Sequence, residues 1–224
     1  MTRWTPYRVV GPTACLVAGM LAVSSGGLRA EAPGPGLTPG TPDRPPGTMP
    51  CDLPAWTNDT DPAGLNVRAA PHRAARILGR LPAPLRFRPE RDVERPPDGL
   101  WRVPFRIVGH RDGWFLIEGA TPPGPDDVLL PPGLPATFTG RGWVAAGMVG
   151  SSLDYAGQGD GLYEAPHLGA GRRPAHDGWG AALGPEAIPR RLLACEGRWG
   201  QVESHDGVTG WWPRFCAAQV TNCN

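Results

Sequence analysis

Apolar and polar residues alternate over several short segments of this chain, a period that is typical of half-buried β-strands. Residues 101–107 (WRVPFRI) alternate throughout, although Pro104 would place that strand at an edge or bulge. In residues 65–68, Leu65 and Val67 share one face of an expected strand. The 32 glycines and 29 prolines lie largely between such segments and mark turns. With no helical period or caps in the sequence, the pattern predicts an all-β fold.

The chain contains one layout twice, which indicates two copies of a small β module. Each copy has a short strand between a glycine and a proline, then a tryptophan-headed strand, then a closing Gly-Trp strand. The matching segments are 64–71 (GLNVRAAP), 113–117 (GWFLI) and 142–144 (GWV) in the first copy, and 161–166 (GLYEAP), 198–202 (RWGQV) and 210–212 (GWW) in the second. The predicted domains are therefore residues 51–150, with a long loop at 119–140, and residues 151–224.

The first 30 residues have the form of a secretory signal peptide. Arg3 and Arg8 form a basic start, residues 14–23 are apolar, and small residues lead to a cleavage site after Ala30. A membrane-spanning helix needs about 20 apolar residues, so this run is too short to be one. We expect export to the periplasm or the medium, with no transmembrane segment after cleavage. Residues 31–50, rich in proline and glycine, are predicted to be a disordered linker.

The basic residues are all arginines, 22 of them against 21 aspartates and glutamates. Removal of residues 1–30 takes away three arginines and no acid, which leaves 19 against 21 and a net charge of −2. A general nucleic-acid binder needs a basic excess to neutralise phosphates, so no nucleic-acid partner is expected. Residues 68–95 hold eight arginines beside three acids. That segment could face an anionic polymer or be ordinary solvated surface.

Four cysteines follow residue 30, and an even number in an exported chain predicts disulfides. Three pairings are possible. A turn at residues 205–207 would fold the chain back so that Cys195 lies nearly opposite Cys216. We therefore predict Cys195–Cys216, which leaves Cys51–Cys223 to join the ends of the folded body. No C-x-x-C or H-x-x-x-H spacing occurs, so neither a metal nor another cofactor is expected.

The first copy resembles the bacterial SH3-like (SH3b) domain family. The family pattern is an LNVR-x-x-P strand, a G-x-L strand, a G-W-x-x-V strand and a closing G-W-V strand. Residues 64–71, 77–81 (ILGRL), 113–117 and 142–144 match it. The second copy, residues 158–219, is divergent because it lacks the Asn-Val-Arg core and has Trp212 in place of the closing valine.

The resemblance implies two small SH3-like β-barrels in tandem, here linked by disulfides. Members of the family are typically exported and non-catalytic, and they often direct envelope proteins to peptidoglycan or mediate protein contacts. The family has no universal binding residues, so the resemblance assigns none in this chain.

Period-two parity separates a core face from an outer face in each copy. The residues predicted to be buried in the first copy are Leu65, Val67, Leu81, Phe105, Ile107, Phe115, Ile117 and Val144. In the second copy, Trp212 should point inward with them. The same parity places four candidate binding residues on the outer faces: Trp114, Trp143, Trp199 and Trp211. These indoles could stack on sugars or peptides, or could cover the barrel edge and the contact between copies.

Three histidines lie just before Asp-Gly pairs, at residues 110–113, 176–178 and 205–207. Histidine and aspartate together can serve as a catalytic base and its orienting group, or as metal ligands. Asp-Gly is also typical of tight turns, and we interpret the three sites as turns. No G-x-S-x-G nucleophile motif is present. The protein is therefore predicted not to be an enzyme.

The sequence favours an exported, non-catalytic binding module for peptidoglycan or another cell-envelope polymer. The alternative is a scaffold or accessory subunit that binds another envelope protein, with the loop at 119–140 as its contact.

Overall fold

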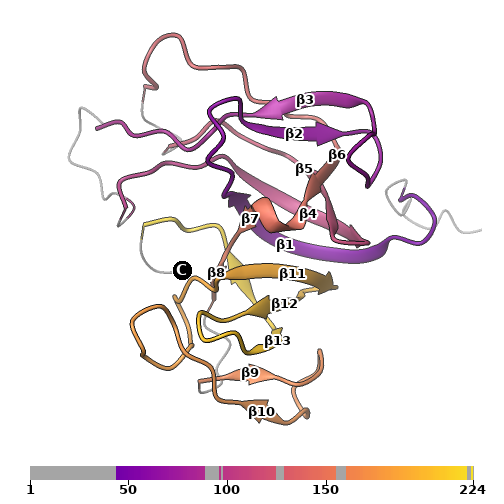
Figure 1. The fold of residues 1–224 in the computed structure, drawn as a ribbon, viewed down its shortest axis with the longest axis vertical. Coiled ribbons are helices and arrows are strands. Elements are labelled where there is room, and N and C mark those ends of the chain that lie inside the picture. Colours follow the sequence, from indigo (N-terminus) through magenta and orange to yellow (C-terminus); the bar gives the residue numbers. More distant parts are fainter. Residues whose placement is uncertain are drawn as a thin grey trace, which may run out of the picture. The chain divides into compact units, whose positions relative to one another are not determined.

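The computed structural model describes residues 44–88, 96, 98–124, 129–154, 160–220 and 223. The fold of these residues is almost entirely β (Figure 1). The strands are β1 (Met49–Thr57), β2 (Leu65–Arg68), β3 (Ile77–Leu81), β4 (Pro104–Arg111), β5 (Trp114–Glu118), β6 (Gly142–Ala145), β7 (Val149–Gly150), β8 (Ser152–Leu153), β9 (Leu162–Tyr163), β10 (Arg172–Arg173), β11 (Arg191–Glu196), β12 (Trp199–Glu203), β13 (Thr209–Trp212) and β14 (Phe215–Cys216). A single 3-10 turn, η1 (Ala146–Met148), interrupts the described strands. The predicted all-β class is confirmed.

The strands form open antiparallel sheets rather than the two closed barrels that the resemblance implies. One sheet has seven strands in the order β3-β2-β6-β5-β4-β1-β7, and the other has five in the order β10-β9-β13-β12-β11. The short β14 and β8 pair separately. Closure would require the two edge strands of a sheet to pair with each other, and β3 is instead bonded along its outer edge by the loop residue Phe138, whose N–H donates to the Arg80 carbonyl at 3.0 Å.

The two sheets repeat one topology. The order β3-β2-β6-β5-β4 in the first copy corresponds strand for strand to β10-β9-β13-β12-β11 in the second. An irregularity in the pairing register also recurs at the corresponding place, between Ile107 and Gly109 in β4 and between Leu192 and Ala194 in β11. The internal duplication predicted from the sequence is thus visible in strand order and in local detail.

Two equivalent glycines show why the motif begins as it does. Gly64 and Gly161 precede β2 and β9 with φ of +77° and +90°, a region that residues with a Cβ rarely adopt. A Cβ on Gly64 would lie 2.3 Å from the Leu81 carbonyl oxygen, and one on Gly161 would lie 2.5 Å from that of Arg173. Only glycine therefore lets the chain enter the sheet against the end of the next strand.

The predicted core of the first copy is confirmed. All eight residues named for it are at most 5% exposed, and Trp212 of the second copy is fully buried. Pro104 does not place its strand at an edge, because β4 lies between β5 and β1. Pro104 is the first residue of β4, a position where proline is tolerated in a sheet. One continuous apolar cluster includes Phe115 from the first copy and Val202 from the second. The two copies therefore share a core.

Strand β1 was not predicted. Its first two residues, Met49 and Pro50, belong to the segment that was expected to be a disordered linker. It begins at Met49 and directs Cys51, Leu53 and Ala55 into the core. Pro50 and Pro54 interrupt this alternation in the sequence, and proline inside a run argues against a strand. β1 pairs with β4 and β7 in the first sheet and packs against β11 of the second (Figure 1). The predicted signal peptide and linker residues 31–43 lie outside the described residues.

The cysteine pairing differs from the prediction. The structure joins Cys51 to Cys195 and Cys216 to Cys223. The predicted Cys195–Cys216 bond assumed that the β12–β13 hairpin continues back to residue 195. The chain instead reverses at Gly197, so Cys195 runs back along β11 and pairs across the sheet with Gly200. Cys216 leaves the sheet in β14, and Cys51–Cys223 is excluded with it.

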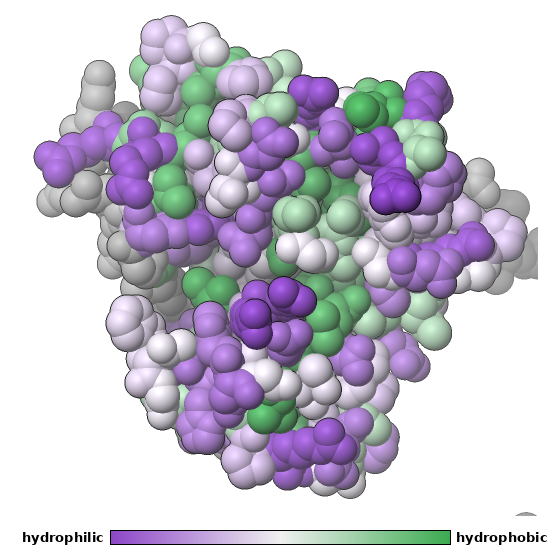
Figure 2. All heavy atoms as spheres, viewed as in Figure 1, coloured by the Kyte–Doolittle hydropathy of each residue, from purple (hydrophilic) through white to green (hydrophobic). Residues whose placement is uncertain are grey.

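Hydrophilic and hydrophobic residues are intermixed on the face of the molecule in Figure 2. Among the described residues, no helix has the length and apolar character needed to cross a membrane.

Replacement of Phe115 by alanine should lower the free energy of unfolding by about 3–5 kcal/mol, because it leaves a cavity in a fully buried site. Trp179→Ala is the matched control. Trp179 is 94% exposed, so its replacement should change the free energy of unfolding by less than about 0.5 kcal/mol. Urea unfolding of both variants measures the difference. Equal losses would contradict the burial described here.

Removal of the Cys51–Cys195 bond should destabilise the protein more than removal of Cys216–Cys223. The chain-entropy model gives about 5 kcal/mol for a separation of 144 residues and about 2–3 kcal/mol for one of 7. Urea unfolding of the two double alanine variants tests this order. Tryptic mapping without reductant is a second test, because cleavage at Arg214 leaves Cys216 and Cys223 in one peptide. A peptide linking Cys195 to Cys216 would overturn the pairing.

Candidate functional site

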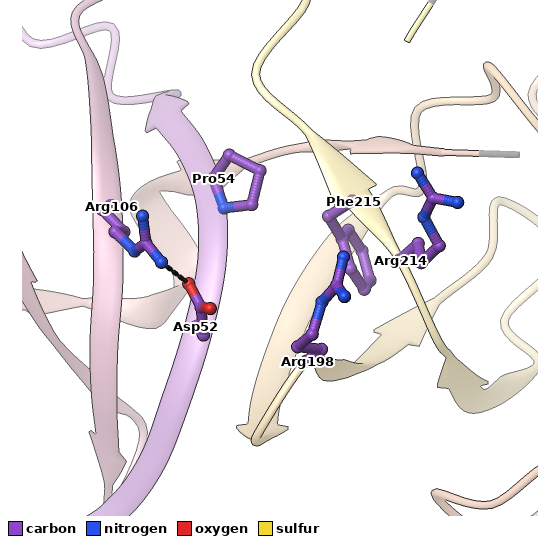
Figure 3. Close-up of a pocket in the computed structure, with 6 residues that line it drawn as sticks. All are labelled: Asp52, Pro54, Arg106, Arg198, Arg214 and Phe215. Carbon is purple, nitrogen blue, oxygen red and sulfur yellow. Dashed lines mark ion pairs between the residues drawn. The ribbon is translucent and has the colours of Figure 1, made fainter. Parts of the chain in front are cut away.

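A pocket of about 270 Å³ lies where strands of both sheets meet. It contains three arginines, one carboxylate and two apolar side chains, contributed by β1, β4, the β11–β12 turn and the segment that enters β14. The lining residues are Asp52, Pro54, Arg106, Arg198, Arg214 and Phe215 (Figure 3). The concentration of guanidinium groups makes it the best candidate for a binding site in the described part of the chain.

Arg106 and Asp52 form an ion pair across neighbouring strands on one side of the pocket (Figure 3). The Arg106 side chain is 60% exposed and that of Asp52 is 45% exposed. Solvent screens such a pair, which is worth about 0–1 kcal/mol. Arg106 can therefore reorient toward a ligand at little cost.

Arg214 forms a firmer pair outside the pocket lining. Its guanidinium lies 2.8 Å from Asp154, whose side chain is only 11% exposed. The Asp154 backbone is fixed as well, because its N–H donates to the Arg214 carbonyl at 3.0 Å and its carbonyl accepts from the Trp212 indole at 2.9 Å. The position of Arg214 is thus set by the core of the second copy.

Arg198 is the third cation, and its position depends on the junction between the copies. It follows Gly197 in the β11–β12 turn. The Gly197 N–H donates to the Pro50 carbonyl, and the Gly197 carbonyl accepts from the Asp52 N–H, both at 2.7 Å. The Cys51–Cys195 disulfide fixes the same contact. Arg198 itself is exposed and forms no ion pair with any carboxylate of the described residues.

The pocket is suited to binding an anion. Two of its cations already hold carboxylates, which shows that the geometry accepts guanidinium–carboxylate contacts, and Arg198 is exposed and lines the same pocket. No group of histidine, cysteine, aspartate or glutamate able to hold a metal ion occurs in the described ranges.

The structure separates the four candidate tryptophans. Trp143 lies on the outer face, but it is only 2% exposed, so neighbouring side chains cover its indole. β6 lies between β2 and β5, and Leu116 and Val108 pack with Trp143 in a second apolar cluster that Trp114 partly covers. An indole on a central strand is covered by its neighbours.

The remaining candidates are half-buried. Trp199 packs edge-on against Tyr163, with ring centroids 5.3 Å apart, and Trp211 is the register partner of Gln201 in the second sheet. Trp114, Trp199 and Trp211 do not line the arginine pocket. Their role in binding stays a prediction.

Sequence reasoning missed the most exposed tryptophan among the described residues. Trp179 is 94% exposed on a turn that Asp177 closes by accepting hydrogen bonds from the N–H groups of Trp179 and Ala181. The signal was present in the sequence, since Gly178 and Gly180 flank this tryptophan and exclude it from a strand. Sequence reasoning also missed the arginine pocket, because its lining residues lie far apart in the chain, from residue 52 to residue 215.

The three His-Asp-Gly sites are turns, as predicted. Asp112 and Gly113 both have positive φ, 50° and 77°, in the tight β4–β5 turn. His110 does not bond to Asp112; it packs on Phe115, and burial lowers its pKa although Asp112 opposes the shift.

The other two turns come together in space, which the sequence did not indicate. His176 Nδ1 lies 2.8 Å from Asp206 Oδ2, and the Ser204 hydroxyl donates to Asp206 Oδ1. These contacts, the serine first, hold the pKa of Asp206 well below its usual range. Ser204 is buried and its hydroxyl also accepts from the Val208 N–H, so the cluster closes the turn between β12 and β13.

Two of the eight arginines of residues 68–95 hydrogen-bond within the first copy. Arg68 donates to the Ala75 carbonyl and Arg80 to the Asn66 side chain. Arg91 and Arg95 lie outside the described residues.

Neither a protein-family model nor a curated protein sequence matches the chain.

Replacement of Asp206 by asparagine should destabilise the fold in a pH-dependent way. A carboxylate whose folded-state pKa is lowered contributes stability above its unfolded pKa, about 3.9, and loses that contribution as the pH falls through the folded value. The melting-temperature gap to wild type should be widest above about pH 5 and shrink on further acidification. Asp112→Asn in the other hairpin is the control. A gap that stays constant down to about pH 2 would contradict the assignment.

Proposed function

We propose that the protein is an exported, non-catalytic binding module that attaches to peptidoglycan or another anionic polymer of the cell envelope. The observation that carries this proposal is the arginine pocket, in which Arg198 is exposed and has no carboxylate partner among the described residues. The mature chain is slightly acidic overall, so the attraction for an anion is local to this pocket.

Two SH3-like copies are the proposed architecture. The repeated strand order, the recurring register shift and the paired glycines Gly64 and Gly161 support a duplicated module with the motif pattern of that family. In this chain the copies remain open sheets that share a core and place a pocket between them.

Export is supported by the two disulfides, because such bonds form and persist outside the reducing cytoplasm. A binding role without catalysis is supported by the use of the candidate catalytic groups: His110 packs on the core, and the His176–Asp206 pair fixes two turns.

The test is sedimentation of the protein with purified cell-wall sacculi. Wild type should pellet with the sacculi, and Arg198→Gln should reduce the affinity by roughly ten- to hundredfold, the loss of about 1.5–3 kcal/mol that accompanies a charged hydrogen bond. Arg76→Gln is the matched control, since Arg76 is exposed in the β2–β3 turn and does not line the pocket. Trp179→Ala tests whether the exposed indole contributes instead.

A wild-type protein that stays in the supernatant would overturn the proposal. If it also co-purifies in fixed proportion with an envelope protein, the scaffold alternative is correct. Equal binding by wild type and Arg198→Gln would move the site away from the pocket.

A further inference from the structure

The charges in and beside the pocket leave a formal excess of one positive charge, which favours a singly charged anion. Arg106, Arg198 and Arg214 contribute three positive charges, and Asp52 and Asp154 neutralise two of them. The remainder is +1, and it resides on Arg198. A phosphomonoester carries a charge of about −1.5 to −2 at neutral pH and would exceed this remainder. A carboxylate matches it.

The shape of the groups agrees with a carboxylate. A guanidinium presents a planar pair of donors that fits the two oxygens of a carboxylate. Two arginines of the pocket already pair with carboxylates, Arg106 with Asp52 in the lining and Arg214 with Asp154 beside it. Figure 3 shows Arg198 and Phe215 on one side of the pocket and Pro54 with the Asp52–Arg106 pair on the other. An anion on Arg198 would thus have apolar surface from Phe215 and Pro54 beside it.

The pocket is small. Its volume of about 270 Å³ lies below the 300–1,000 Å³ of most drug-sized ligand sites, and it is open to solvent, so it suits the end of a chain whose remainder lies outside the pocket.

We infer that the pocket binds the terminal carboxylate of a short peptide whose last residues are small and apolar, with Arg198 as the main contact. The inference rests on the proposed function, because it names the group of an envelope polymer that the same pocket would hold. Arg198 lies in the β11–β12 turn and Arg106 in β4, so the site needs both copies and the Cys51–Cys195 junction between them.

The test uses N-acetyl-alanyl-alanine as the free acid and as its C-terminal amide, titrated into the full-length mature protein by NMR. The acid should shift resonances of the pocket residues, and the amide should bind at least roughly tenfold more weakly, because it lacks the charge that Arg198 recognises. Arg198→Gln should weaken binding of the acid by roughly ten- to hundredfold, and Arg76→Gln should not. The Cys51→Ala/Cys195→Ala variant should also lose affinity, since its turn is no longer fixed to β1.

Equal binding of acid and amide by the wild type would overturn the inference, and this comparison needs no variant that might misfold. Inorganic phosphate that displaces the acid at equal concentration would also overturn it, because the site would then be a general anion site. Sacculus binding that depends on Arg198, without binding of the acid, would refute the carboxylate and leave the proposed function intact. Binding of the acid without binding of sacculi would refute the proposed function and leave the carboxylate site intact.

Discussion

The contact between β1 and the β11–β12 turn is the constraint on which the rest of the structure depends. Two backbone hydrogen bonds at Gly197 and the Cys51–Cys195 disulfide fix one sheet to the other at this point. The disulfide closes a span of 144 residues, the case in which a cross-link removes most entropy from the unfolded chain. Around it, the apolar faces of both copies join in one cluster. Neither sheet has to bury its inner face alone.

The same contact creates the candidate site. Asp52 and Pro54 follow Cys51 on β1, Arg106 is on the neighbouring strand, and Arg198 follows the turn glycine. The junction that links the two copies therefore also positions Asp52 and Arg198, whereas Asp154 holds Arg214. The site lies outside both sheet interiors, and solvent screens the exposed Arg106–Asp52 pair there.

Duplication explains why the copies resemble each other in strand order and differ in surface. The glycines at 64 and 161 are required by backbone geometry in both, so they persist in the motif. The outer faces carry no such constraint. One buries Trp143 under Trp114 and its neighbours, and the other pairs Trp199 with Tyr163. The two copies thus share a strand order and differ in how their outer faces pack.

The sequence by itself determined what depends on neighbours along the chain. Alternation identified the inward faces, with Phe115 and Val144 among the buried residues, and the Asp-Gly pair at 112–113 identified a tight turn. The repeat identified the duplication. These features follow from local backbone geometry and from burial of one face of a strand.

Only the tertiary structure decided what depends on contacts between distant segments. The chain reversal at Gly197 placed Cys195 against Cys51. Strand β1 formed although two prolines interrupt its alternating pattern. The pocket brings together arginines from positions 106, 198 and 214. The open form of the sheets and the burial of Trp143 by its neighbours also depend on such distant contacts. Period-two parity states which way a side chain points, but what covers it is set by residues far away in the sequence.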